Sequence, residues 1–591
     1  MSIRHALGVL AAAGGLQAAT LPANASDTPA AVADTQRAAT RHDLFQQERQ
    51  RDNIYVVRFA DAASTRLAAI SFHDALLQAH YERNALTLQL DEDDIARLRH
   101  DGYTLERDDA FIKRRDAALA LVERSGPNAT LLGKDAVSGV DESGAAIPGF
   151  PCYPTLEETQ AAAQAIVAAH PTLATYTDVG DSWEKIHGFG GHDVFVLKLT
   201  NSKIAGPKPK LLVTAAIHAR EYTTSPVALS FAQQLVAGYG KDADATWILD
   251  HHELHLMLNV NPDGRKQAET GLLWRKNTDQ DYCGAANVNR GADLNRNFEF
   301  SWNTTDGRGS SGAQCQETYR GPSAGSEPET QVIEAYARSL WPDSRGPNKG
   351  DAAPDDTSGI HIDLHSYADL VLWPWGDTKT PAGNATSLQT AGRHFAFFNK
   401  YEPMQSIGLY PTDGTSDGVS YGELGVAAYT FEMGTDFFES CSSYESTTRP
   451  ANLRALLYAA KVVRTPYITP AGPDANGLKL KPNAGKTPVA AGTLVTLSGS
   501  ATDLVFNDTN GTQPKHPIAA AEYYVDTPPW LAGAVANPLS AVDGTFDATV
   551  EQIGGKISTA GWKKGPHLVY VRAQDNAGNW GAFSATFLRI K

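Results

Sequence analysis

The pattern of apolar and polar positions divides the chain into three parts. Between about 150 and 468, near-continuous apolar runs such as 211–217 and 360–367 alternate with helical periodicity, as at 225–238 and 451–463. Apolar strands that alternate with helices are typical of a largely parallel sheet covered on both faces. We therefore expect an α/β domain here, with further strands at 194–200, 254–260 and 427–433.

The parts on either side differ from this central region. Near the front, 53–59 and 85–90 alternate as strands do, and 92–100 and 108–124 have helical periodicity. A connector rich in Gly, Ser and Asn follows at 125–148. The last 120 or so residues hold short alternating runs separated by Gly, Pro, Thr and Asp, which favours an all-β, Ig-like sandwich. Its strands are expected at 493–497, 521–525, 567–572 and 583–590.

The extreme N-terminus indicates export. Arg4 and His5 precede an apolar run over 6–19, and Ala23-Asn24-Ala25 offers a small-x-small cleavage site. This order is typical of a secretory signal peptide, and the alternative is a disordered tail. We expect a secreted, extracellular protein that passes the periplasm in transit. The predicted division is a signal peptide at 1–25, a pro-region with a small α/β domain at 26–149, a catalytic domain at 150–468 and a β-sandwich at 469–591. An ordinary N-terminal domain that stays attached is the alternative to a pro-domain.

Composition excludes several classes of function. With 42% hydrophobic and 20% charged residues, the 591-residue chain is typical of globular rather than disordered proteins. The formal net charge of −16 would repel phosphate backbones, so no nucleic-acid partner is expected. No run after the N-terminus reaches the ~18–20 apolar residues of a membrane span. The four cysteines of an exported chain predict two disulfides with three possible pairings, and none lies in the CxxC spacing of a zinc site.

The candidate chemistry lies at strand ends of the central region. His218-Ala219-Arg220-Glu221 directly follows the run 211–217, and His365 ends the run over 360–365. Binding sites of open α/β sheets gather at the carboxyl ends of strands. His, Glu and His would give a catalytic zinc three ligands and leave one position open. HxxE alone is common, so this hypothesis depends on its neighbours.

Those neighbours carry a resemblance to a known family. They are Trp274-Arg275-Lys276-Asn277, Asp293-Leu294-Asn295-Arg296-Asn297-Phe298, His365-Ser366-Tyr367 and Tyr429-Thr430-Phe431-Glu432-Met433. Over 150–468 the chain resembles the zinc metallocarboxypeptidases of the pancreatic carboxypeptidase A/B type. The resemblance implies their fold, a mixed and largely parallel sheet covered by helices, and one Zn²⁺ per catalytic domain. It also implies hydrolysis at peptide or protein C-termini by a monomer.

The resemblance assigns roles residue by residue. It makes His218, Glu221 and His365 the zinc ligands, Glu432 the general base and Arg275 the group that stabilises the oxyanion. It places Asn295 and Arg296 on the substrate carboxylate, Tyr410 over the substrate, and Arg220, Ser366 and Tyr367 in outer subsites. It pairs Cys283 with Cys315, which leaves Cys152 for Cys441. It further implies an activating protease that cuts between Arg114 and Gly149.

Side-chain preference is the least determined property. The resemblance points to the residue seven after Tyr410, which is Asp417, and Asp413 is near. An acidic residue there would favour C-terminal Lys or Arg, giving a basic or dual preference. The loop 412–420 lacks the family's usual Asp-Trp pair, so its register is open by one residue. Both carboxylates could instead be solvated loop residues.

Other motifs have simpler interpretations. The run His251-His252-Glu253-Leu254-His255 is one residue short of a zinc-binding HExxH helix and leads into a strand, so we expect surface histidines. Glu327 and Glu329, around Pro328, are expected to cap a helix. Two other functions remain open, namely an amidase or endo-acting enzyme on cell-wall peptides and a binding protein with an inert central domain.

Overall fold

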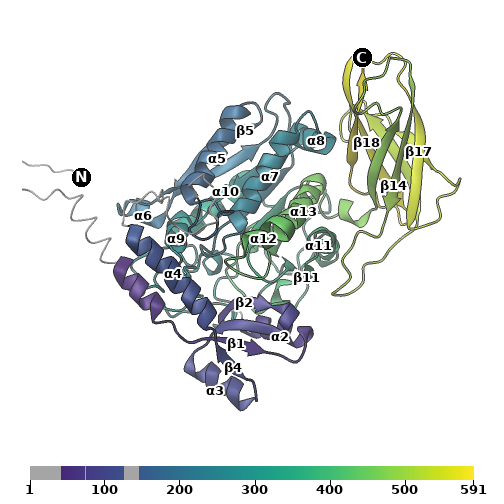
Figure 1. Ribbon diagram of the computed structural model, residues 1–591. Coiled ribbons are helices and arrows are strands. Elements are labelled where there is room, and N and C mark those ends of the chain that lie inside the picture. Colours follow the sequence, from purple (N-terminus) through teal and green to yellow (C-terminus); the bar gives the residue numbers. More distant parts are fainter. Residues whose placement is uncertain (1–40, 73–74, 126–145) are drawn as a thin grey trace, which may run out of the picture.

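The computed structural model describes residues 41–72, 75–125 and 146–591 (Figure 1). The predicted signal peptide at 1–25 and most of the predicted connector lie outside the described residues. Three bodies follow one another along the chain. A small α/β unit lies against one side of a large α/β domain, and an all-β domain lies beside helices of that domain on another side.

The small N-terminal unit is an antiparallel sheet covered by helices. Its strands lie in the order β2-β3-β1-β4. They are β1 (Ile54–Arg58), β2 (Leu76–His80), β3 (Ala85–Gln89) and β4 (Leu105–Arg107), with helices α2 (Ala62–Ser71), α3 (Glu92–His100) and α4 (Asp109–Ser125). A further helix covers residues 41–49. The expected strands at 53–59 and 85–90 and the helix at 92–100 are confirmed.

The central domain is built on an eight-stranded mixed sheet of order β11-β10-β12-β9-β7-β8-β6-β5. Its inner strands β12, β9, β7 and β8 are parallel to one another, whereas β5 and β6 are antiparallel. The strands are β5 (Ala174–Asp181), β6 (Asp193–Leu199), β7 (Lys210–Ala215), β8 (Glu253–Met257), β9 (Ile360–His365), β10 (Leu370–Trp373), β11 (Glu402–Gln405) and β12 (Ala427–Glu432). The fold class expected from the sequence is therefore confirmed.

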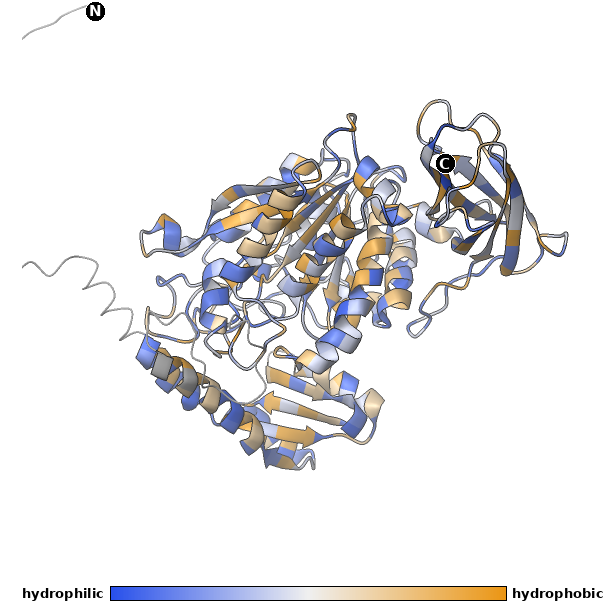
Figure 2. Cartoon of the chain, turned by 45° about the horizontal axis from the view of Figure 1, so that its top comes forward, coloured by the Kyte–Doolittle hydropathy of each residue, from blue (hydrophilic) through white to orange (hydrophobic). Residues whose placement is uncertain are grey.

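Helices cover both faces of this sheet. They are α5 (Leu156–Ala169), α7 (Thr224–Gly238), α8 (Ala243–His251), α10 (Pro328–Leu340), α11 (Ala385–Asn399) and α13 (Arg449–Val462), with short α6 (Trp183–Ile186), α9 (Pro262–Ala268) and α12 (Cys441–Ser443). Successive side chains of a strand point to opposite faces. In β7, Leu211 and Val213 therefore enter one hydrophobic core, while Leu212 enters a second core beneath α10. Figure 2 shows the inner strands mostly hydrophobic and the helices mixed.

The C-terminal domain is all antiparallel. Its seven strands lie in the order β13-β14-β17-β16-β15-β18-β19. They are β13 (Asp474–Lys481), β14 (Leu494–Thr502), β15 (Ile518–Val525), β16 (Asn537–Ala541), β17 (Val550–Ser558), β18 (Gly565–Asp575) and β19 (Ser584–Ile590). β16 pairs with both β15 and β17 and so joins the two halves of the sandwich. The domain has its own core, but Tyr570 and Phe583 belong to the core of the central domain.

Two local expectations are wrong. His252 and His255 are buried, not on the surface. His252 lies beneath Trp530 of the C-terminal domain, and its Nδ1 is 2.9 Å from the Ala460 carbonyl oxygen. His255 Nδ1 is 2.8 Å from the hydroxyl of Tyr336 on α10. Both histidines are covered by elements far away in the sequence, which local periodicity does not indicate.

The expected capping of α10 is also wrong. Glu327 occupies the N-cap position, but its side chain accepts no capping hydrogen bond. Glu327 and Glu329 are instead fully buried. Glu329 Oε1 accepts a hydrogen bond from the Trp183 backbone N–H at 2.7 Å. The two carboxylates therefore hold other segments in place rather than the end of their own helix.

Both disulfides implied by the resemblance are formed. Cys283 is bonded to Cys315 and Cys152 to Cys441, so no cysteine is free. Such bonds persist in oxidising compartments, which is consistent with an extracellular protein. Among the described residues, every helix is too short or too polar to cross a membrane.

Candidate active site

The candidate site lies at the carboxyl ends of three neighbouring parallel strands. β7 ends at Ala215 and the chain reaches His218 three residues later, while β9 ends at His365 and β12 at Glu432. His365 and Glu432 face each other in the β9–β12 register, so their side chains leave the sheet side by side. The topology thus brings together residues that are more than 200 positions apart.

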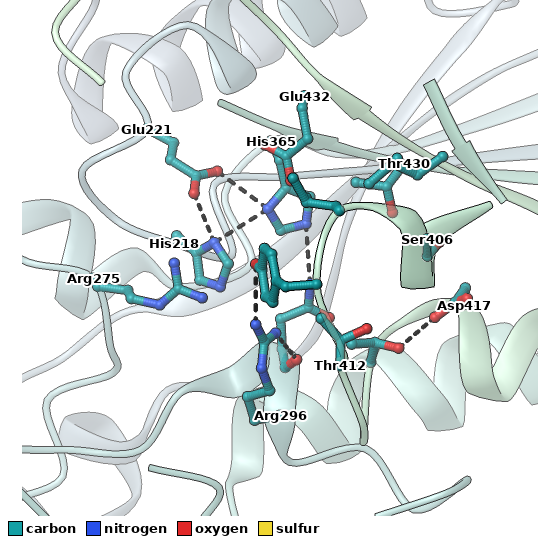
Figure 3. A pocket seen from close by; sticks show the side chains of 15 residues that line it. His218, Glu221, Arg275, Arg296, His365, Ser406, Thr412, Asp417, Thr430 and Glu432 are labelled. Carbon is teal, nitrogen blue, oxygen red and sulfur yellow. Dashed lines mark hydrogen bonds and ion pairs between the residues drawn. The ribbon is translucent and has the colours of Figure 1, made fainter. Parts of the chain in front are cut away.

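Three buried side chains converge at this point (Figure 3). His218 Nδ1 is 2.7 Å from Glu221 Oε1, and His365 Nδ1 is 3.1 Å from His218 Nδ1 and 3.3 Å from Glu221 Oε2. Their donor atoms all lie within 4.8 Å of one another. Two imidazole nitrogens and a carboxylate directed at one point are a donor set that fits a zinc ion.

The outward nitrogens of both histidines are held by carboxylates. His218 Nε2 donates to Asp293 Oδ1 at 3.1 Å, and His365 Nε2 donates to Asp363 Oδ2 at 2.9 Å. A proton fixed on Nε2 leaves the Nδ1 lone pair available to a metal, and such carboxylates are a usual second shell of zinc sites. The sequence analysis missed Asp293 and Asp363 as functional residues. Their only signal is an Asp placed two residues before His365 and before Asn295.

The electrostatics follow from burial and from these close charges. Burial raises the pKa of Glu221, but the neighbouring His218 and His365 outweigh it and hold the pKa well below its usual range. Burial likewise raises the pKa of Asp293, yet Arg275 and His218 keep it far below its ordinary value. Burial raises the pKa of Glu432 to about 8, because His365 and Arg275 offset the effect of burial only in part.

Arg275 shares Asp293 with His218. Its Nε and Nη2 donate to Asp293 Oδ2 at 3.0 and 2.9 Å, and the guanidinium lines the same pocket as the three convergent residues. One buried carboxylate therefore orients both a candidate metal ligand and a cation. The bond to Asp293 therefore fixes the position of the Arg275 guanidinium in the pocket that Glu432 also lines.

Asn295 and Arg296 also line the pocket, from the short turn η3 (Leu294–Arg296), and Asn295 Nδ2 lies 3.3 Å from His365 Nε2. The Asn295 side-chain oxygen accepts from the Ser416 backbone N–H at 2.9 Å. Arg296 donates through Nε to the Gly309 carbonyl oxygen and through Nη1 to the Asn295 carbonyl oxygen, both at 2.7 Å, and Nη2 is 3.3 Å from the Tyr410 hydroxyl. Arg296 is thus fixed with its charge toward the pocket beside Tyr410.

The far end of the pocket is lined by small polar and aliphatic residues and one acid. They are Leu372, Ser406, Leu409, Thr412, Thr415, Asp417 and Thr430. Asp417 Oδ1 accepts from the Thr415 hydroxyl at 2.5 Å, and burial raises the pKa of Asp417. Asp413 has a different place, because its Oδ2 accepts from the Thr305 backbone N–H and hydroxyl. Of the two candidate acids, Asp417 is therefore the one that lines the pocket.

The expected outer-subsite residues do not line this pocket. Arg220 is buried, with its guanidinium over the Phe437 ring at 4.3 Å. Tyr367 is buried against Phe437 and the hydrophobic core of the N-terminal unit. Ser366 acts through its backbone, because its N–H donates to Glu221 Oε2 at 3.0 Å. The N-terminal unit thus covers the surface where these residues were expected to meet substrate.

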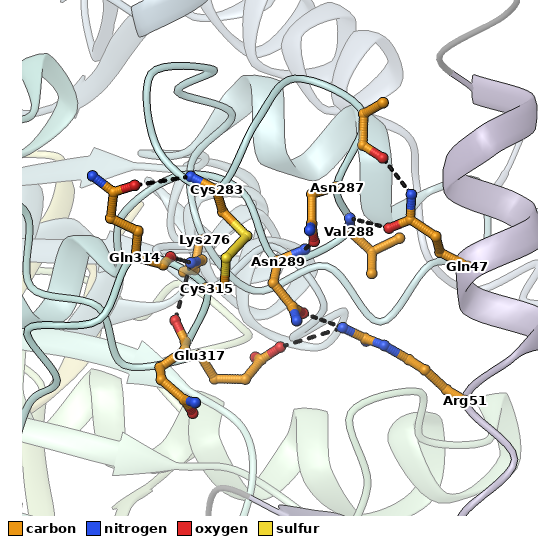
Figure 4. The surroundings of a disulfide bond; sticks show 12 residues. Gln47, Arg51, Lys276, Cys283, Asn287, Val288, Asn289, Gln314, Cys315 and Glu317 are labelled. Atoms are coloured by element: carbon orange, nitrogen blue, oxygen red, sulfur yellow. Dashed lines mark hydrogen bonds and ion pairs between the residues drawn. A yellow bond between two sulfur atoms is a disulfide. The ribbon is translucent and has the colours of Figure 1, made fainter.

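Two groups of hydrogen bonds join the N-terminal unit to the central domain, in addition to the packing of Leu44, Phe45, Leu119 and Val122 into the core of that domain. In the first, the edge strand β2 meets the loop after β12, where the Ala79 backbone N–H donates to the Thr435 carbonyl oxygen at 3.1 Å and Gln78 contacts Asp436. In the second, the segment just before β1 contacts the loop of the Cys283–Cys315 disulfide (Figure 4).

A buried amide connects the two loops that carry the arginines. Asn277 Nδ2 donates to Glu327 Oε2 at 2.7 Å and Glu329 Oε2 at 3.2 Å, and its Oδ1 accepts from the Ala292 backbone N–H at 2.8 Å. Burial raises the pKa of Glu327, and raises that of Glu329 to about 8. Asn277 therefore ties the segment of Arg275 to the segment that leads to Arg296.

Comparisons with known proteins agree with this geometry. Residues 159–447 match the Peptidase_M14 family model, described as zinc carboxypeptidase. The chain is 31% identical over 300 residues to a zinc carboxypeptidase of Saccharothrix mutabilis subsp. capreolus, a match that covers 48% of this chain and 62% of the relative. It is 28% identical over 292 residues to carboxypeptidase A1 of Bos taurus, covering 48% of this chain and 63% of the relative. The chain thus spans about three fifths of the length of these relatives.

Solved structures share the fold. Thrombin activatable fibrinolysis inhibitor superposes with a TM-score of 0.50 at 18% identity, over 70% of this chain and 98% of that chain. Carboxypeptidase A from Helicoverpa armigera superposes with a TM-score of 0.50 at 22% identity, over 68% and 95% of the two chains. At these identities the likeness concerns the fold.

Proposed function

We propose that this protein is a zinc-dependent exopeptidase that removes single residues from the C-termini of peptides and proteins, because residues 159–447 match the zinc carboxypeptidase family model. One observation carries the proposal. A His-Glu-His donor set, the acid Glu432 and the fixed Arg296 line one pocket. The donor set and the acid suit metal-assisted hydrolysis, and the arginine suits recognition of a chain end.

In this proposal His218, Glu221 and His365 hold the zinc ion. When bound, zinc supplies a Lewis acid that polarises a carbonyl and lowers the pKa of water. Glu432 accepts the proton of the attacking water and returns it to the leaving amine, for which a pKa near the working pH is suitable. Arg275, oriented by Asp293, stabilises the negative charge that develops on the carbonyl oxygen.

Recognition of the chain end is assigned to Arg296 and Asn295. Arg296, with Asn295, binds the terminal carboxylate, because a planar guanidinium donates two parallel hydrogen bonds to a carboxylate. Tyr410 lies beside Arg296 and would close over the bound residue. Asp417 at the far end supports a preference for C-terminal Arg or Lys, alone or together with other side chains.

We further propose that the chain is secreted as a proenzyme. Tyr367 is buried against the core of the N-terminal unit, and Arg220 is buried over Phe437, which packs in the same core; these contacts support a latent form in which outer subsites are blocked. An activating protease would cut outside a helix, and α4 extends to Ser125. Cleavage between α4 and residue 149 would therefore release the unit.

The test uses protein matured by limited trypsin treatment. Blocked dipeptides that end in Phe, Leu, Arg or Lys are compared with the same peptides carrying a C-terminal amide, with and without a zinc chelator. We expect chelator-sensitive hydrolysis of the free acids alone, and an Arg-to-Phe ratio that falls in Asp417→Asn. Equal hydrolysis of the amides would contradict the role of Arg296 and favour an endo-acting or cell-wall amidase activity. A folded protein without turnover and without bound zinc would favour a binding protein.

A further inference from the structure

A carboxylate on the disulfide loop binds an arginine of the N-terminal segment. Glu317 Oε1 lies 4.0 Å from Arg51 Nη2, and its Oε2 lies 3.2 Å from Arg220 Nη1. Arg51 Nη2 also donates to the side-chain oxygen of Asn289, and Nη1 donates to Glu48 at 3.3 Å (Figure 4). A guanidinium of the chain itself is therefore held between two acceptors of the central domain.

Asn289 lies within the loop that the Cys283–Cys315 disulfide closes, and Glu317 lies just after it, two residues beyond Cys315. The N-terminal segment contacts this loop at Val288, but other contacts fix it as well. Lys276 Nζ donates to the Gln314 and Gln316 carbonyl oxygens, both at 3.0 Å. The acceptors would thus keep their places when the segment leaves.

The arrangement of charge leaves one side of Glu317 for a cation. Arg220 is buried and directed at Oε2, so its charge compensates that side of the carboxylate. Oε1 and the Asn289 oxygen both face Arg51. A carboxylate oxygen and an amide oxygen together match the several N–H donors of a guanidinium. Arg220 directly precedes Glu221, which places these acceptors beside the candidate metal site.

We propose that in the matured enzyme Glu317 and Asn289 form a subsite for an arginine side chain upstream of the scissile bond, which Arg51 occupies in the full chain. This subsite rests on the exopeptidase function and the maturation proposed above. Since the pair is partly solvent-exposed, a gain of about three- to tenfold in kcat/KM is expected for a substrate that fills it.

The experiment uses matured protein and blocked hexapeptides that share one C-terminal residue. Arginine, or its neutral and nearly isosteric analogue citrulline, is placed in turn at each of the four positions upstream of the cleaved bond. We expect one position at which the arginine peptide has a kcat/KM about three- to tenfold above that of the citrulline peptide, through KM. Glu317→Gln should bring this ratio to about one, and Asn289→Asp should raise it.

Controls separate the possible failures. Glu445→Gln, in an exposed carboxylate that pairs with Arg449, should leave the ratio unchanged. Equal kcat/KM values for arginine and citrulline at every position would overturn the subsite, as would a ratio that survives Glu317→Gln. A preference for a glutamate at that position would also overturn it, because Arg220 and Lys276 would then dominate the local charge. If even citrulline peptides are not hydrolysed, the exopeptidase function itself fails.

Discussion

The amide of Asn277 gives the sharpest test of how the arginine-bearing loops are held. Asn277→Asp keeps the shape of the side chain but replaces its NH₂ group with an oxygen. Glu327 Oε2 and Glu329 Oε2, now 2.7 and 3.2 Å from the amide nitrogen, would then face a third carboxyl group instead of a donor. All three residues are fully buried, so water cannot take the place of the lost donor without opening the structure.

The magnitude follows from two hydrogen bonds to buried carboxyl groups. A hydrogen bond to a charged group contributes about 1.5–3 kcal/mol, and leaving a buried acceptor unpaired costs a similar amount. If the new carboxyl group is protonated it can restore one of the two bonds. We therefore expect a loss of about 2–4 kcal/mol in the free energy of unfolding at pH 8, and about half of that at pH 5.

The sign of the pH dependence can be worked out from the neighbours. Burial raises the pKa of Glu329 to about 8 and also raises that of Glu327, so a third carboxyl group there also has a pKa above its unfolded value of about 3.9. The folded state then binds more protons than the unfolded state above that value. The pH-dependent part of the destabilisation is thus absent below about pH 4 and grows as the pH rises toward the folded pKa, while the loss of one hydrogen bond remains at every pH.

The assay is urea unfolding followed by tryptophan fluorescence at pH 5 and pH 8, combined with kcat and KM of the matured enzyme. Since Asn277 lies two residues after Arg275, kcat should fall more than KM rises. Asn303→Asp, at an exposed position, is the matched control and should change the free energy of unfolding by less than about 0.5 kcal/mol. An unchanged midpoint at pH 8, or a loss that does not shrink at pH 5, would refute this account of the loop.

Two further predictions concern the contacts between the three bodies. Trp530→Ala should lower the free energy of unfolding by about 2–3 kcal/mol, because it uncovers the buried Trp247 and removes the ring beneath Arg464. Leu531→Ala, at 44% exposure, is the control. Equal urea midpoints for the Trp530→Ala variant and the unchanged protein would show that the C-terminal domain does not stabilise the enzyme. Asp369→Asn should raise the melting temperature at pH 8 but not at pH 4, because burial raises the pKa of Asp369 to about 7 and its ionisation destabilises the fold progressively above about pH 4. A calorimetric difference of the same size at both pH values would contradict that cause.

Much of the fold is predictable because its inner strands are buried on both faces. Such strands form near-continuous apolar runs, as in 211–217, or alternate apolar residues with buried polar ones, as in 360–365, and the sequence analysis placed them within a few residues. Most of the strands that it did not predict lie at edges or are short, but β17, which has nine residues and lies between β14 and β16, is neither. β5 is half-exposed, and β10 and β11 have four residues each. A short or edge strand depends on its neighbours more than on its own pattern.

Some residues of the candidate site could likewise be predicted from the sequence, and others could not. The convergent residues were predicted because each lies at the end of an apolar strand and within a recognisable motif. Asp293 and Asp363 were not, because a carboxylate that orients a histidine has no signature of its own until the fold brings the two together. Glu327 and Glu329 fit a local capping rule, but Asn277 and Trp183 reach them from other segments. Tertiary hydrogen bonds outweighed the local preference.

On the proposed assignment, the chain uses one surface for two purposes. Arg220, Tyr367 and Glu317 would contact substrate in the matured enzyme. In the full chain Tyr367 and Glu317 contact the N-terminal unit, and Arg220 pairs with Glu317. A substitution at these positions therefore changes docking and substrate recognition together. Substitutions on the other side of the interface, at Arg51 or Gln78, change docking alone. Comparing the two sets of variants would separate latency, the inactivity of the full chain, from substrate specificity. If substitutions at Arg51 and Gln78 left latency unchanged, a shared surface would be contradicted.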